Sequence, residues 1–154
     1  MDLRGRITEA TKEAMRARAA DRLSVLRLMG SAIKDRDIAA RGGGEPSPVS
    51  DDGVTAALAR MVKQRGESAR AYDEAGRADL AAKERAEAAV IEKFLPQQLS
   101  EAEMAEAVAE AVAAEGATSL RDMGRVMAAL RARHAGAMDM GRAGAMVKAR
   151  LAAG

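Results

Sequence analysis

The stretch FLPQQLSEAE, residues 94–103, decides how the chain is organised. Proline lacks a backbone N–H and biases the preceding residue away from the helical conformation, so we expect a helix to end at Leu95 before Pro96. Ser100 and Glu103 have the spacing of a capping box, in which each side chain accepts a hydrogen bond from the other residue's backbone N–H. One helix therefore ends and another begins within this stretch.

A helix stop followed directly by a helix start predicts two helical units, residues 1–96 and residues 97–154. The stretch also holds Phe94, the single phenylalanine of the chain. Phe94 and Leu95 are the bulkiest apolar pair in this part of the sequence, and we expect them to close the base of the first unit. The joint thus separates two small hydrophobic cores.

The composition of the chain favours helices over strands. Of its 154 residues, 48% are hydrophobic, yet only one is Phe and one is Tyr, whereas ten are Met. Unbranched side chains lose little rotamer freedom in a helix, while sheets favour β-branched and aromatic residues. We therefore predict an all-α fold, in which a four-helix bundle is followed by a smaller three-helix bundle.

Apolar residues recur with helical spacing through most of the chain. The loop RGGGEPSPVS (41–50) interrupts this pattern in the first unit. The helices predicted there cover about residues 2–18, about 21–40 with Asp21 as cap, about 50–76 with Ser50 as cap and Gly76 as stop, and about 79–95. Those predicted in the second unit begin after Ser100, Ser119 and Asp139, and the first of them ends at Gly116.

Several classes of protein are excluded by what the sequence lacks. It contains no cysteine and one histidine, which excludes a disulfide framework and a His-rich metal cluster. The motifs of nucleotide-binding loops and serine hydrolases are also absent, so we expect no catalytic residue, no metal and no cofactor. His134 shares the phase of Leu130 and is interpreted as a packed imidazole at a helix end, with catalysis as the alternative.

The N-terminal residues MDLRGRITEA are charged and contain no apolar segment. No later uncharged run approaches the roughly 18 residues that a membrane span needs. We therefore expect a soluble protein of the cytoplasm with no membrane partner.

Charge is unevenly distributed, although the formal net charge is only +2. Residues 97–118 carry five acidic residues and no Lys or Arg. Residues 119–154 carry seven Lys or Arg against two acidic residues. Because phosphate binding needs cations on a rigid surface, we predict that these seven bind nucleic acid: Arg121, Arg125, Arg131, Arg133, Arg142, Lys148 and Arg150.

Two carboxylates interrupt an apolar stripe in the fourth predicted helix. Glu84 and Glu87 share a face with Leu80, Ile91 and Phe94. Buried acids need partners, so we interpret them as members of structural ion pairs, with a catalytic carboxylate pair as the alternative. The candidate partners are Arg27, Lys34, Lys63, Arg65 and Arg77.

Four stretches of the chain resemble the GatB/YqeY family, and specifically its small stand-alone YqeY-like members. They are RLSVLRLMGSAIKDRDI (22–38), AGRADLAAKERAEAAVIEKFLPQQLS (75–100), DMGRVMAAL (122–130) and VKARL (147–151). They follow the order of the family and cover nearly the whole chain. The resemblance implies a four-helix bundle joined to a three-helix bundle. Ala137 stands where a common family form has Arg, so no basic contact is carried over to that position.

The resemblance also implies a function. In the amidotransferase that converts Glu-tRNA(Gln) or Asp-tRNA(Asn) to the amide, a related module forms the tail of the B subunit and docks against tRNA. The catalytic core precedes that tail, whereas this sequence begins with the module, so no autonomous activity is implied. We therefore expect a non-catalytic tRNA-binding or translation-accessory module, with tRNA and amidotransferase or other translation proteins as partners.

Two alternatives stay open from the sequence. The first is a carbon–nitrogen ligase with glutamine as amido-N-donor, active as part of an amidotransferase complex. The second is a helical protein–protein adaptor, which the contrast between the acidic residues 97–118 and the basic residues 119–154 favours.

Overall fold

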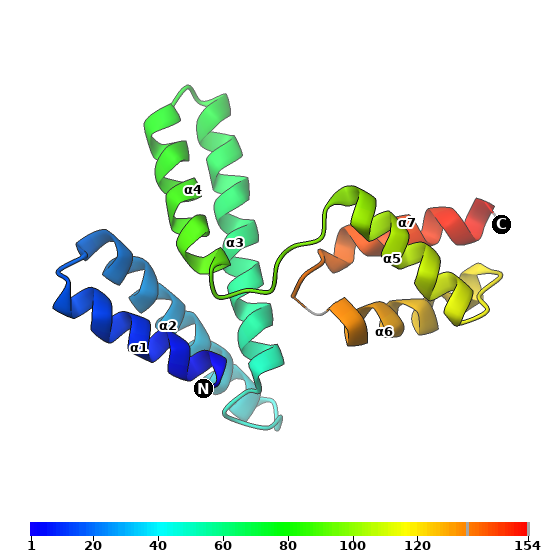
Figure 1. Ribbon diagram of the computed structural model, residues 1–154, viewed down its shortest axis with the longest axis horizontal. Helices are drawn as coiled ribbons and strands as arrows, with labels where there is room; N and C mark the ends of the chain where they lie inside the picture. The colour runs from blue at the N-terminus through cyan, green and yellow to red at the C-terminus, as the bar shows by residue number, and fades with distance from the viewer. Residues whose placement is uncertain (135, 154) are drawn as a thin grey trace. The chain divides into compact units, whose positions relative to one another are not determined.

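The computed structural model of the protein describes residues 1–134 and 136–153, and within them the regular secondary structure is entirely helical (Figure 1). The all-α prediction is confirmed. The seven α-helices of the described residues are α1 (Leu3–Arg16), α2 (Ala20–Gly42), α3 (Asp51–Glu74), α4 (Ala78–Glu92), α5 (Glu101–Ala114), α6 (Met123–His134) and α7 (Met140–Ala153).

The chain divides into two compact units, Met1–Pro96 and Gln97–Gly154. The first contains helices α1 to α4, and the second contains α5 to α7 with a short 3-10 helix, η1 (Leu120–Asp122). Each unit has its own cluster of buried apolar side chains. Four helices therefore surround one core and three surround the other, in agreement with the predicted bundles.

All four helices contribute to the core of the first unit. Leu26, Met29, Leu58 and Ile91 are almost completely buried there. Phe94 belongs to the same cluster, and Leu95 packs against it, as expected for the pair that precedes Pro96. The guanidinium carbon of Arg6 lies 5.6 Å from the centre of the Phe94 ring, which places a cation over its face.

Helices α3 and α4 continue together beyond this core as a hairpin (Figure 1). Its buried residues are alanines: Ala69 from α3, with Ala81 and Ala88 from α4. Such small side chains let two helix backbones approach closely. Gly76, with φ of 73°, lies in the turn, where the left-handed conformation favours glycine.

The predicted helix starts are partly confirmed. Ser50 precedes α3 and accepts a hydrogen bond from the backbone N–H of Gly53 at 3.4 Å. The prediction that Asp21 caps the second helix is wrong, because α2 begins at Ala20 and has no side-chain cap. Asp21 lies instead within the first turn of α2, which follows the left-handed residue Arg18 at φ 53°.

The fourth helix ends earlier than Pro96 alone predicts. Helix α4 stops at Glu92, three residues before Leu95. The backbone N–H groups of Phe94 and Leu95 donate to the carbonyls of Ile91 and Glu92 at 3.0 and 3.1 Å, which is the tighter 3-10 pattern. The last turn before Pro96 is therefore tighter than an α-helix, as is common at helix ends.

The start of α5 is the predicted capping box. The Ser100 hydroxyl accepts from the backbone N–H of Glu103 at 3.1 Å, and the Glu103 carboxylate accepts from the backbone N–H of Ser100 at 3.0 Å. The backbone N–H of Ser100, followed by its side chain, lowers the pKa of Glu103. The same segment is held to the second unit by the backbone N–H of Leu99, which donates to the carbonyl of Ala137 at 2.8 Å.

The second unit is assembled around small apolar side chains. Its deeply buried residues include Val108 of α5, Val126 and Leu130 of α6, and Ala143 and Val147 of α7. Met104, Ala107, Ala111, Met127, Met138 and Leu151 complete the cluster.

Of the other two helix starts predicted in the second unit, one is confirmed and one is not. Asp139 caps α7 as predicted, because its carboxylate accepts from the backbone N–H groups of Gly141 at 2.8 Å and Arg142 at 3.3 Å. Helix α6 does not follow Ser119 directly, because η1 intervenes and α6 begins at Met123. A 3-10 turn at the N-terminus of an α-helix is a common way to satisfy its first N–H groups.

An ion pair that the sequence does not predict joins three segments of the first unit. Arg4 of α1 donates two hydrogen bonds to the carboxylate of Asp37 of α2, at 2.6 and 2.9 Å, and one to the carbonyl of Val49 at 3.0 Å. The backbone N–H of Val49 donates to Asp37 at 2.9 Å. The hydrogen bonds from Arg4, followed by the one from the Val49 N–H, lower the pKa of Asp37 from 3.8 to about 2.

Asp37→Asn should remove part of the acid sensitivity of the first unit. A carboxyl group whose pKa is lower in the folded chain stabilises the fold above its ordinary pKa of 3.8, and this contribution is lost as the pH falls to about 2. Circular dichroism melts between neutral and acidic pH should therefore show a smaller decline for the variant than for the wild type. Asp35→Asn, on the same helix, should retain the wild-type decline, and equal curves for all three proteins would contradict the prediction.

Ser100→Ala should lower the free energy of unfolding of the second unit by about 1 kcal/mol, since the N–H of Glu103 loses its acceptor. Urea unfolding followed by circular dichroism measures this change. Ser68→Ala, on the exposed surface of α3, removes a hydroxyl without removing a cap and should leave stability unchanged or slightly raised. A Ser100 variant as stable as the Ser68 variant would show that the capping box has no energetic role.

Candidate nucleic-acid interface

The seven cationic residues predicted to bind nucleic acid are all exposed and all lie in the second unit. Arg121 lies in η1, Arg125, Arg131 and Arg133 lie in α6, and Arg142, Lys148 and Arg150 lie in α7.

Two of the seven have a carboxylate partner within the chain. Arg125 pairs with Asp122 at 2.8 Å and also donates to the carbonyl of Glu115 at 3.2 Å. Arg142 of α7 pairs with Glu101 at the start of α5. The other five form no ion pair with the described part of the chain, so their charge is available to a ligand.

The carboxylate of Asp122 organises the entry to α6. It accepts from the backbone N–H of Thr118 at 2.8 Å and of Ser119 at 3.2 Å, while Arg125 donates to its other oxygen. The Thr118 N–H, followed by Arg125 and the Ser119 N–H, lowers the pKa of Asp122 to about 2. Asp122 therefore stays ionised at physiological pH and holds Arg125 on the surface.

Helical phase shows which cations share a surface. A Cβ atom placed on Gly144 of α7 would lie 3.8 Å from the methyl carbons of Met123 and Met127, so these residues mark the contact between α6 and α7. Arg131 lies four residues after Met127, and Lys148 lies four residues after Gly144, so each flanks this contact on its own helix.

The other cations point elsewhere. Arg133 and Arg150 are two residues beyond Arg131 and Lys148, and a step of about 200° takes them to the opposite flanks of α6 and α7. Arg121 and Arg125, one turn apart, lie on the outward side of η1 and α6. We call Arg131 and Lys148, which flank the same contact, the α6/α7 basic surface.

Helix α5 presents the opposite charge. Glu103, Glu106 and Glu110 are exposed and follow the i, i+3, i+7 spacing, so they form an acidic stripe facing away from buried Met104 and Val108. A polyanion is repelled from this stripe and attracted to the α6/α7 basic surface.

The predicted ion pairs of the first unit are only partly formed. Arg65 of α3 pairs with Glu87 of α4 at 3.1 Å, and both side chains are largely buried, with 14% and 21% exposure. Arg77 pairs at 3.2 Å with Asp79 rather than with Glu84 or Glu87. Glu84 is half-buried and forms no ion pair with the described residues.

The prediction that Arg27, Lys34 or Lys63 pairs with Glu84 or Glu87 is wrong. All three are exposed and form no ion pair within residues 1–134 and 136–153. Arg27 lies two residues before buried Met29, a step of about 200° that turns it away from the core of the unit. The sequence predicts that Arg27 flanks the apolar face of this helix, but the face that is buried does not extend as far as Arg27.

Neither a metal centre nor a transmembrane helix is found in the described residues. They contain no group of three or more His, Cys, Asp or Glu that could hold a metal ion. None of their helices is long and apolar enough to span a bilayer. His134 is half-buried at the last residue of α6, consistent with a packed imidazole at a helix end.

Comparison with known families decides the relationship of the chain. The family model described as Yqey-like protein matches residues 4–151, nearly the whole length. The chain belongs to the YqeY-like protein family. This confirms the resemblance that its motifs show, and it applies to both helical units, since the match crosses the joint at Pro96. No curated protein matches the chain.

Glu87→Gln should lower the free energy of unfolding of the first unit by about 1–3 kcal/mol, because the largely buried guanidinium of Arg65 loses its charged acceptor. Replacing both partners in Arg65→Met/Glu87→Leu should restore part of this loss, since neither charge then has to be desolvated. Urea unfolding of the three proteins checks the order of stability. A single variant as stable as the wild type would show that the ion pair makes no net contribution.

Proposed function

We propose that the protein is a non-catalytic RNA-binding module of translation, that its RNA is tRNA, and that it acts in the cytoplasm. The α6/α7 basic surface supports this proposal: its two cations, Arg131 and Lys148, have no carboxylate partner in the described part of the chain. Guanidinium groups match phosphate oxygens in shape and charge, so arginines of this kind suit a phosphate backbone.

A folded RNA fits this surface better than a single strand does. Proteins that bind single strands without sequence preference stack bases on aromatic side chains. The only Phe and the only Tyr of the chain are Phe94 and Tyr72, which precede the second unit. Cations on rigid helices can instead contact the phosphates of an RNA whose shape is already fixed. A tRNA is such a ligand in translation.

Family membership supports the choice of RNA without specifying it. In the amidotransferase, the related tail module docks against tRNA, and we propose the same class of ligand here. The amidotransferase and other translation proteins are the proposed protein partners. The acidic stripe of α5 limits the approach, so the RNA contacts the unit from the side of α6 and α7.

Titration of purified tRNA into the protein at increasing salt tests this proposal. Binding should weaken steeply with salt, because each neutralised phosphate releases counterions. Arg131→Gln/Lys148→Gln should reduce the affinity. It should also reduce the slope of log affinity against log salt by the amount that corresponds to about two phosphate contacts. Arg133→Gln/Arg150→Gln removes the same charge from the opposite flanks and should have the smaller effect.

Two results would overturn the proposal. One is the absence of binding at low salt, where electrostatic attraction is strongest. The other is an equal loss of affinity in both double variants, since net charge rather than the α6/α7 basic surface would then govern binding. Amide formation on charged tRNA by the protein alone, without added amidotransferase subunits, would instead favour a carbon–nitrogen ligase.

A further inference from the structure

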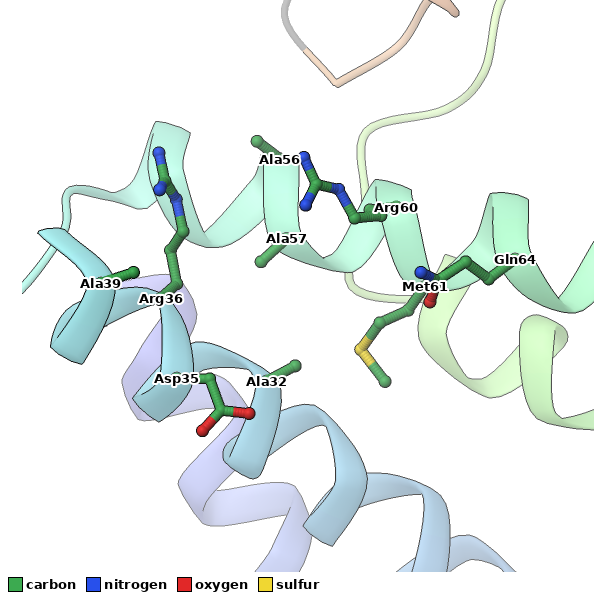
Figure 2. A pocket seen from close by; sticks show the side chains of 9 residues that line it. All are labelled: Ala32, Asp35, Arg36, Ala39, Ala56, Ala57, Arg60, Met61 and Gln64. Atoms are coloured by element: carbon green, nitrogen blue, oxygen red, sulfur yellow. The ribbon is translucent and has the colours of Figure 1, made fainter.

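A groove in the first unit is not used by the proposed RNA contact. It lies between α2 and α3 and has a volume of about 410 Å³ (Figure 2). Its walls are Ala32 and Ala39 of α2 and Ala56 and Ala57 of α3, with Met61 beside them. The polar residues along it are Asp35, Arg36, Arg60 and Gln64.

The two arginines of the groove are free to bind a ligand. Arg36 and Arg60 are exposed, and neither forms an ion pair with the described residues. Figure 2 shows the carboxylate of Asp35 well apart from both guanidinium groups. The groove therefore combines two arginines, one from each helix and neither in an ion pair with the described residues, and one carboxylate, Asp35, with an apolar lining of alanine.

This combination fits an acidic helix better than a phosphate backbone. Phosphates would bind the arginines but would gain nothing from the alanine walls, because burial of apolar surface requires an apolar partner. A helix with small residues on one face can approach such walls closely and bury them. Its carboxylates would bind the arginines at the rim through charge-assisted hydrogen bonds.

The chain itself contains a helix of this description. The outward face of α5 is made of Ala102, Glu106, Ala109, Glu110 and Ala113, which follow the i, i+4, i+7, i+8, i+11 spacing. All of them are exposed except Ala109, which is half-buried. No long apolar or cationic side chain interrupts this face. Glu106 and Glu110 lie one turn apart, and neither forms an ion pair with the described residues.

We propose that the groove between α2 and α3 binds the outward face of α5 from a second copy of the chain. The alanines of α5 pack against those of the groove, and Glu106 and Glu110 bind Arg36 and Arg60. Every copy carries both surfaces, and the proposal is that two copies exchange them reciprocally in a symmetric dimer. The proposed dimer contact uses residues of α2, α3 and α5 and none of the α6/α7 basic surface. Substitutions can therefore test dimer formation and RNA binding separately.

Sedimentation velocity over a series of protein concentrations tests the proposal. The wild type should shift from the 16.1 kDa monomer towards twice that mass as concentration rises, and high salt should oppose the shift. Arg36→Glu/Arg60→Glu and Glu106→Arg/Glu110→Arg should each remain monomeric, because like charges then face each other in the contact.

Mixing the two charge-reversed variants is the decisive measurement. Each contact in the mixture again pairs two arginines with two glutamates, so an equimolar mixture should recover the dimer. Recovery also shows that both variants are folded, which a loss of association alone does not show. Arg27→Glu/Lys34→Glu is the matched control, since these cations are equally exposed on α2 but lie away from the groove, and it should associate like the wild type.

Three outcomes would overturn the proposal. The first is a wild type that stays monomeric at all concentrations. The second is a mixture that fails to associate, or a groove variant that still forms the dimer. The third is a groove variant that loses tRNA affinity while the wild type is monomeric, since the groove would then contact RNA instead.

Discussion

The scarcity of aromatic side chains is the constraint on which the rest of the structure depends. An alanine or valine buries little area and so contributes little free energy. The chain therefore needs close helix packing and many contributing helices, as the alanines between α3 and α4 show. Phe94 is the exception: it fills the base of the first core just before Pro96, where one bulky residue closes the space between helices.

The exposed surfaces of the helices are also made of few residue types. Alanine, arginine and glutamate occupy most exposed positions, so helices differ from one another mainly in charge. Within the second unit, α5 is acidic and the side formed by α6 and α7 is basic. Charge separated in this way orients a binding partner as well as attracting it. Charge alone does not separate the two proposed ligands, and it is the alanine walls of the groove between α2 and α3 that favour an acidic helix there over RNA.

Features set by neighbouring residues could be predicted from the sequence, and features set by distant contacts could not. Pro96, Ser100 and Glu103 act over a few residues, so the joint was predictable. The Arg4–Asp37 pair links residues 33 positions apart and exists only once α1, α2 and the loop have folded. The groove with Arg36 and Arg60 gave no signal either, because alanine is so frequent that a wall of alanines resembles any other helix.

The separate cores have a consequence for spectroscopy. The chain has no tryptophan, and its single tyrosine, Tyr72, lies in the α3–α4 hairpin of the first unit. Near-ultraviolet emission therefore arises from that unit alone. A fluorescence melt therefore reports directly on the first unit alone, and unfolding of the second unit has to be followed through its helices.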